Sequence, residues 1–264
     1  MPSSLAMDIL FALGLAARGA RPLFAICDGA SPACNVRSLS DAIPLERWSE
    51  RCPGCRDTMR AMLDQAGLDH TEAGACLDPD QLLQLGNMVR DIPSPSLPGF
   101  MHGAAQVGYH AKASLIRYLR GVPIREHAGS QALLRAYACS ALIHADQAAL
   151  LARTFQPDFV VMQHGIYADW GPALDVFHDH GVDVILWRRG MLPDHFMFRL
   201  TPPGHALHVN HLQPGVWERI SQEHMDQTQE LEDFLRGESQ HNSRFNEQEM
   251  EPEALRARLK LENS

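Results

Sequence analysis

The chain has 264 residues, a net charge of −9 and 45% hydrophobic residues, which is enough apolar material to bury a core in one or two domains. Its acidic residues are spread out and no basic patch is present, so nucleic-acid binding is not expected. No segment approaches the roughly 20 apolar residues that span a bilayer, and the apolar run 9–17 lacks the flanks of a signal peptide. We therefore expect a cytoplasmic protein without a transmembrane segment.

Helical patterns dominate the first two thirds of the chain. In chain order, the patterns predict a helix over 5–18, a strand over 23–27, a loop over 31–44, a tight turn at 52–55, a helix over 56–66, a helix over 78–90, a proline-rich loop over 93–99, and helices over 102–119 and 130–154. Asp78 and Pro79 mark the clearest boundary, because Asp is a favoured N-cap and Pro fits the first helical position.

A strand, helix and strand pattern over 158–187 is the most regular part of the sequence. An apolar run over 158–163 is followed by a helical pattern over 171–180 and a second apolar run over 182–187, which predicts a βαβ unit with parallel strands. Between the first strand and the helix lies the polar, glycine-containing segment 164–170. Substrates of open α/β sheets bind outside the carboxyl ends of the strands, so this segment predicts a ligand-binding loop.

His164 is the first candidate for chemistry, because an imidazole at the end of a strand can reach a reacting group and exchange protons near neutral pH. The alternative is a polar residue that ends the strand and caps the next helix. Asp28 and Gly29 end the predicted strand 23–27 and would lie at the same sheet edge as His164 if both strands are parallel. Their alternative is a simple turn.

Four of the six cysteines have the spacing of a possible metal site, with six, seventeen and two residues between Cys27, Cys34, Cys52 and Cys55. Four thiolates can close a tetrahedral zinc site. The same spacing is compatible with structural thiols that bind nothing, and a Cys at a helix start is favoured as the reactive thiolate of redox proteins. The sequence leaves these three interpretations open. Cys76 and Cys139 are expected to be core residues.

Six short motifs are more informative in their order than singly. They are Leu15-Ala16-Ala17-Arg18-Gly19-Ala20, Cys27-Asp28-Gly29-Ala30-Ser31-Pro32-Ala33-Cys34, Cys52-Pro53-Gly54-Cys55, Val107-Gly108-Tyr109-His110-Ala111 with Arg117, His164-Gly165-Ile166-Tyr167, and Gly181-Val182-Asp183-Val184-Ile185-Leu186-Trp187. In this order they resemble a bacterial family of surface and capsular polysaccharide biosynthesis glycosyltransferases. The similarity covers most of residues 5–234.

The resemblance implies a GT-B architecture, which is built from two Rossmann domains. Residues 1–236 would form an α/β, Rossmann-like, acceptor-side domain with a Cys-rich insertion at 27–55 and a helical insertion at 78–154. Helices are predicted over 221–236 and 251–261. Residues 237–264 would form a linker and the last of these helices, leading toward a second, carboxyl-terminal domain. That domain would hold most of the nucleotide-sugar donor. The implied partners are this domain and a saccharide or lipid-linked acceptor, at a cytoplasmic location peripheral to the inner membrane.

Glycosyl transfer needs a base for the attacking hydroxyl and groups that stabilise the departing diphosphate. The resemblance makes His164 the candidate base. The candidate acceptor-binding residues are Asp28, Gly29, Gly165, Tyr167 and Asp169. The alternative for Tyr167 and Trp170 is that they pack between helix and sheet. The alternative for Asp169 is that it is the N-cap of the next helix.

Two functions from other classes stay open beside the transferase. One is a non-catalytic binding or scaffolding module stabilised by zinc at the four cysteines. The other is a thiol redox protein that uses Cys52 and Cys55. In the transferase interpretation, residues 1–264 alone are expected to be inactive, because the donor site lies mostly in the second domain.

Overall fold

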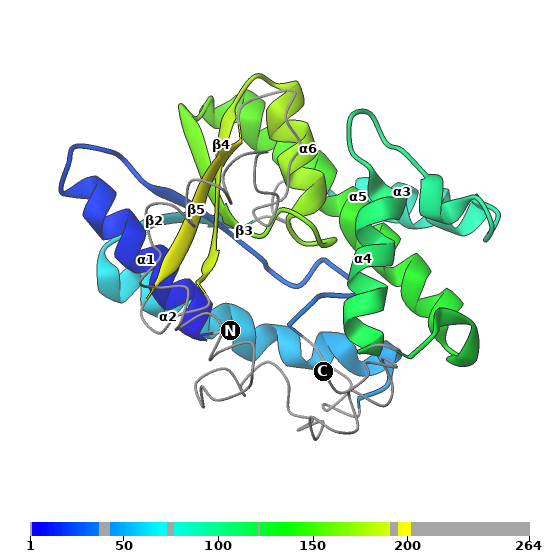
Figure 1. Cartoon of the computed structure of the whole chain (residues 1–264). Helices are drawn as coiled ribbons and strands as arrows, with labels where there is room; N and C mark the ends of the chain where they lie inside the picture. The colour runs from blue at the N-terminus through cyan, green and yellow to red at the C-terminus, as the bar shows by residue number, and fades with distance from the viewer. Residues whose placement is uncertain (1, 37–42, 73–76, 121, 191–194, 202–264) are drawn as a thin grey trace, which may run out of the picture. The chain divides into compact units, whose positions relative to one another are not determined.

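A computed structural model describes residues 2–36, 43–72, 77–120, 122–190 and 195–201. The helices predicted over 221–236 and 251–261, the linker between them and Cys76 lie outside the described residues. The chain divides into two compact units, one with Met1–Trp187 and Phe198–His208 and the other with the remaining residues. The elements below, shown in Figure 1, belong to the first unit except where β4 and β5 extend past it.

The amino-terminal part alternates helices and short strands. Its elements are α1 (Pro2–Ala16), β1 (Leu23–Ile26), the 3-10 helix η2 (Leu45–Arg51), α2 (Cys52–Ala66) and β2 (Asp69–Glu72). β1 and β2 pair in parallel, with Leu23 opposite Asp69 and Ile26 opposite Glu72. The sequence analysis missed β2 because its four residues, Asp-His-Thr-Glu, are polar and carry no apolar alternation.

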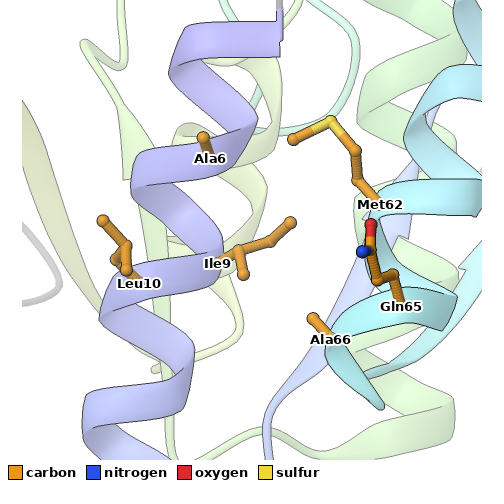
Figure 2. Close-up of a pocket in the computed structure, with 6 residues that line it drawn as sticks. All are labelled: Ala6, Ile9, Leu10, Met62, Gln65 and Ala66. Atoms are coloured by element: carbon orange, nitrogen blue, oxygen red, sulfur yellow. The ribbon is translucent and has the colours of Figure 1, made fainter.

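An apolar core joins α1, α2 and the two strands. Its buried members are Ile9, Ala12, Ile26, Leu63 and Leu68. Figure 2 shows how α1 and α2 face each other across a small pocket beside this core. The pocket is lined by Ala6, Ile9, Leu10, Met62, Gln65 and Ala66. Apolar side chains of both helices therefore hold α1 against α2.

Four helices make up the middle of the chain, α3 (Pro79–Asp91), α4 (Val107–Leu119), α5 (Ser130–Phe155) and, later, α6 (Gly171–Asp179). The long helix α5 contacts α3, α4 and α6, which lie around it in Figure 1. The predicted start of α3 is confirmed, because Asp78 accepts a hydrogen bond from the Gln81 N–H and the Gln81 side chain accepts one from Asp78 in return. None of the helices in the described ranges is long and apolar enough to cross a membrane.

The predicted βαβ unit is confirmed. β3 (Phe159–Gln163) and β4 (Asp183–Arg189) pair in parallel, and α6 connects them. β5 (Phe196–Thr201) is the neighbour of β4 in the three-stranded sheet. The Thr201 hydroxyl donates to the Val184 carbonyl over 2.7 Å, and the His178 ring donates to the Thr201 carbonyl over 2.7 Å. The described part of the chain is a mixed α/β structure in which β1 with β2 and β3 with β4 form parallel pairs.

Three details of the predicted elements are wrong. Residues 52–55 do not form a tight turn, because α2 begins at Cys52 directly after η2 and Pro53 occupies its first turn. Residues 102–106 precede α4 rather than belong to it, since His102 and Ala105 exchange backbone hydrogen bonds in a tight turn. β1 and β3 belong to two separately hydrogen-bonded sheets in the described part of the chain, although one shared sheet edge was expected.

Candidate functional site

The loop after β3 leaves the strand through two consecutive left-handed residues. His164 has φ 53° and Gly165 has φ 67°, and the Gly165 N–H donates to the Gln163 carbonyl over 2.6 Å. A side chain at Gly165 would place its Cβ 2.8 Å from a methyl of Leu174, so only Gly fits. At this sharp turn His164 is half-buried rather than enclosed in the core.

Three half-buried rings of this loop form a cluster, called here the ring cluster and consisting of His164, Tyr167 and Trp170. The His164 ring centroid lies 6.1 Å from that of Tyr167 and 5.9 Å from that of Trp170, both edge to face. The Tyr167 and Trp170 centroids are 6.3 Å apart. All three residues keep part of their surface exposed, so a ligand could reach the cluster from solvent.

Arg117 of α4 lies beside the ring cluster. Its guanidinium carbon is 4.8 Å from the centroid of the Tyr167 ring, and its Nη1 donates to the Tyr167 hydroxyl over 3.3 Å. A cation over an aromatic face is attracted by the negative face of the ring. α4 therefore adds one positive charge to a surface whose rings come from a single loop.

Asp169 joins the loop after β3 to the loop after β1. Its Oδ2 accepts hydrogen bonds from the backbone N–H of Asn35 over 3.0 Å and from the Asn35 amide over 3.2 Å. It does not cap α6, whose N-cap residue is Trp170 without a side-chain hydrogen bond. Although β1 and β3 lie in different sheets, the two loops that follow them therefore meet through Asn35 and Asp169.

The loop after β1 is also fixed to α5. The Ala33 N–H donates to the Ser140 hydroxyl over 3.0 Å, and this hydroxyl donates to the Ala33 carbonyl over 2.6 Å. One helical turn further, Nε2 of His144 lies 3.1 Å from the Ser31 hydroxyl. α5 thus supports the face of the loop that leads from Asp28 to Asn35.

His144 and Asp169 form an electrostatically linked pair at this junction. Burial raises the pKa of Asp169, and the nearby His144 and the Asn35 hydrogen bonds oppose this rise. Burial lowers the pKa of His144, and the charge of Asp169 opposes that fall. Burial therefore favours the uncharged form of both groups, as expected when desolvation outweighs the attraction of a partner charge that is not in direct contact.

Polar atoms without a partner gather at the same place. In the described ranges, Oδ1 of Asn35, Oδ1 of Asp169 and the hydroxyl of Tyr137 are buried and have no hydrogen-bond partner. Tyr137 is close enough to Asp169 and Arg117 for their charges to act on its hydroxyl, although burial is the main reason that its pKa is raised. Buried polar groups normally find partners, so such groups beside a candidate site suit ligand binding better than stability.

A second buried pair, His110 and Asp175, holds the back of the loop after β3. The His110 ring contacts the Ile166 carbonyl through Nδ1 over 2.5 Å and Oδ2 of Asp175 through Nε2 over 2.9 Å. Because a carbonyl only accepts, Nδ1 donates, and a charged ring can donate to the carboxylate as well. The Gln106 N–H also donates to this carboxylate over 2.8 Å. Gly171 leaves the space that the His110 ring fills.

The candidates near the end of β1 have modest local roles. Oδ1 of Asp28 accepts from the Ala30 N–H over 3.1 Å, which is the simple turn foreseen as its alternative. Gly29 has φ 98°, and its N–H donates to the Cys27 sulfur over 3.3 Å. A Cβ on Gly29 would lie 2.8 Å from Cβ of Cys52. Cys27 and Cys52 therefore flank Gly29.

The four cysteines of the predicted zinc site do not all share one location. Cys34 lies next to Asn35 in the loop after β1, and Cys55 lies in the first turn of α2, one turn after Cys52. Within the described residues, no group of three or more Cys, His, Asp or Glu side chains is arranged to hold a metal ion. Cys139, expected in the core, is only partly buried in α5.

Sequence reasoning missed most of the residues that assemble this site. Asn35 and His144 were not singled out, and Ser31, His110 and Arg117 were noted only as parts of motifs. His144 shares a helical face with Ser140 and Tyr137, and a polar residue on such a face was a usable signal. No protein-family model, curated protein or solved structure matches the chain.

Proposed function

We propose that this chain is the acceptor-side, Rossmann-like half of a GT-B glycosyltransferase and that the loops after β1 and β3 form its saccharide site. The observation that carries the proposal is the ring cluster beside Arg117, at the carboxyl end of a strand in a parallel βαβ unit. Ligands of α/β proteins bind at this end of the strands. The order of sequence motifs supports the same family.

The chemistry of the site suits a sugar. Half-buried aromatic rings offer apolar faces to the C–H faces of a pyranose ring, while hydroxyl and amide groups around them bond its hydroxyls. Tyr167 and Trp170 supply the faces, and Asp169 with Asn35 supplies polar atoms at the junction of the loops. His164, in the same ring cluster, is the proposed base that would take a proton from an acceptor hydroxyl.

The donor is proposed to be a nucleotide sugar that binds mainly to a second, carboxyl-terminal domain. In that case this chain binds an acceptor without turning it over. Transfer to a saccharide or lipid-linked acceptor would need both domains, and the leaving diphosphate would be stabilised mostly by the second one.

Acceptor binding tests the proposal directly. A panel of mono- and oligosaccharides is titrated against the chain while tryptophan fluorescence and heat of binding are followed. We expect some members to bind and to change the fluorescence of Trp170, and Tyr167→Ala or Trp170→Ala to weaken binding by roughly 10-fold or more. Trp48→Phe serves as the control, since Trp48 is buried near Tyr118 and Tyr137. A panel with no binder at all would refute the saccharide site.

A suitable substitution of His164 can separate its proposed role as a base from acceptor binding. His164 occupies a left-handed backbone conformation, which Asn tolerates better than Ala. In a protein that carries both domains, His164→Asn is expected to retain acceptor binding and to lose transfer by about 100-fold or more. Turnover at the normal rate in this variant would remove His164 from the chemistry.

A structural zinc ion at the cysteines is the second candidate, favoured by the convergence of Cys27 and Cys52 around Gly29. It would make the chain a zinc-stabilised binding or scaffolding module, with or without transfer. Elemental analysis of the purified protein measures zinc per chain, and Cys52→Ser is expected to abolish it while Cys139→Ser leaves it unchanged. A metal-free protein that melts cooperatively would exclude this role and leave Cys52 and Cys55 to be tested for reversible oxidation.

A further inference from the structure

Arg117 makes contacts of another kind than Arg47, Arg60 and Arg135. Arg47 and Arg60 pair with Glu50 and Glu72, and Arg135 donates to the Val89 carbonyl at the end of α3. These are structural uses of a guanidinium. Arg117, in contrast, is held against an aromatic residue of the candidate site by an N–H contact and a ring contact.

The charge of Arg117 has no carboxylate counterpart in direct contact. Among the described residues, none of its nitrogens lies within 4.0 Å of a carboxylate oxygen, the distance that defines an ion pair. The charge of Arg117 acts through space on Asp169, where it only opposes the rise in pKa that burial causes, and Asp169 bonds Asn35 with Oδ2 while its Oδ1 is buried. A chain with a net charge of −9 thus holds an exposed cation at its ring cluster that no described carboxylate neutralises by contact.

We propose that Arg117 anchors an anionic group of the ligand, a carboxylate or a phosphate, while the ring cluster holds the adjoining sugar. This inference rests on the proposed saccharide site and adds the charge of its ligand. The planar guanidinium has five N–H donors in a fork that matches two oxygens of a carboxylate or phosphate. Only one N–H is directed to Tyr167.

The neighbourhood of Arg117 adds a second donor. The Tyr137 hydroxyl is buried without a partner in the described structure and lies within range of the Arg117 charge. A hydroxyl that keeps its proton can donate to an anionic oxygen.

Titrations with simple anions test the proposal. The probes are sodium glucuronate, methyl glucoside as its neutral counterpart, inorganic phosphate and pyrophosphate, each measured by heat of binding and by NMR shifts of the chain. We expect at least one anion to bind and Arg117→Gln to weaken it by roughly 10- to 100-fold. Arg117→Lys should recover part of the affinity, because it keeps the charge and loses the fork. Lys112→Gln, an exposed charge on the same helix, is the control.

The arms of this experiment separate the sources of the anion. Preference for glucuronate over methyl glucoside assigns an acidic sugar, and preference for pyrophosphate assigns a phosphate of a lipid or nucleotide. Anions that do not bind, or that bind Arg117→Gln as tightly as the unmodified chain, overturn the inference. Neutral saccharides that bind at Trp170 in that event would leave the proposed function intact, whereas anion binding without any saccharide affinity would leave Arg117 and remove the saccharide site.

Discussion

Two His–Asp pairs in this protein use the same two side chains in opposite ways. His110 and Asp175 are in direct contact, and their hydrogen bonds to each other, to the Ile166 carbonyl and to the Gln106 N–H are all 2.9 Å or shorter. His144 and Asp169 act on each other through space, and Asp169 leaves one buried oxygen without a partner among the described residues. The first pair is a fully satisfied internal support, and the second is under-satisfied at the edge of the candidate site.

The difference shows which pair stabilises the fold and which pair leaves polar groups available to a ligand. His110 ties α4 to the back of the loop after β3, so it fixes the position of the ring cluster without facing a ligand. His144 and Asp169 lie where the two candidate loops meet. Buried polar groups in the supporting structure are expected to have hydrogen-bond partners, whereas those of a functional site are expected to be left without some of them. Four predictions test this division.

The largest expected effect is the loss of the satisfied pair. His110→Ala leaves the Asp175 carboxylate buried without its hydrogen-bonding partner, which costs about 3–5 kcal/mol of unfolding free energy. Urea denaturation measures it. The control is His102→Ala, which breaks the half-exposed His102–Asp146 contact of 2.8 Å and is expected to cost about 1 kcal/mol or less. Equal losses in the two variants would contradict a supporting role for His110.

Asp8 tests a third arrangement, a half-buried acid with one neutral donor. It accepts from the Trp187 indole over 2.6 Å, and burial raises its pKa to about 7 against the opposing effect of that hydrogen bond. Because the folded pKa lies above the unfolded value, its stabilising contribution is complete below about pH 4 and is lost as the pH rises through 7.

Asp8→Asn removes this titration. The variant is expected to gain on the order of a few kcal/mol relative to the unmodified chain between about pH 4 and pH 8, since the cost of a buried charge disappears. Thermal unfolding at a series of pH values measures the difference. A difference that stays constant with pH would show that Asp8 does not titrate in this range.

Gly171→Ala tests the support given by His110 through the packing of its ring. An added Cβ would overlap the His110 ring, so the ring must leave its position between Ile166 and Asp175. We expect a loss of about 1–3 kcal/mol or more. Gly86→Ala in α3 meets no atom within 4 Å and should instead stabilise by about 0.5–1 kcal/mol. Denaturation midpoints of the two variants are compared, and a Gly171→Ala variant as stable as the unmodified chain would show that the His110 ring is not held in place by packing against Gly171.

The smallest effect is expected at Tyr137, where a polar group is kept without a partner. Tyr137→Phe removes a buried hydroxyl that no described residue bonds, so the free protein should gain about 1 kcal/mol. The same variant should bind an anion more weakly if this hydroxyl donates to it. Denaturation of the free protein and anion titration measure the two effects. Destabilisation by Tyr137→Phe would show that the hydroxyl already has a partner.

The sequence predicted much of the local architecture and part of the site. The βαβ unit and the turn at His164 followed from the apolar period and the position of Gly165, and both are present. The sequence did not predict β2, because a polar strand has no apolar alternation to indicate it. The zinc interpretation depended on spacing alone, and spacing does not fix where sulfurs that are separated by a loop will lie.

What the sequence by itself determined is the order of helices and strands, since apolar periodicity, caps and glycines act between near neighbours. Only the tertiary structure decided that Asn35 meets Asp169, that His110 meets Asp175 and that Arg117 meets Tyr167. These partners are 134, 65 and 50 residues apart. Their pairing follows from the packing of α4, α5 and α6 around the loops, and no local pattern encodes contacts that form only when distant elements pack together.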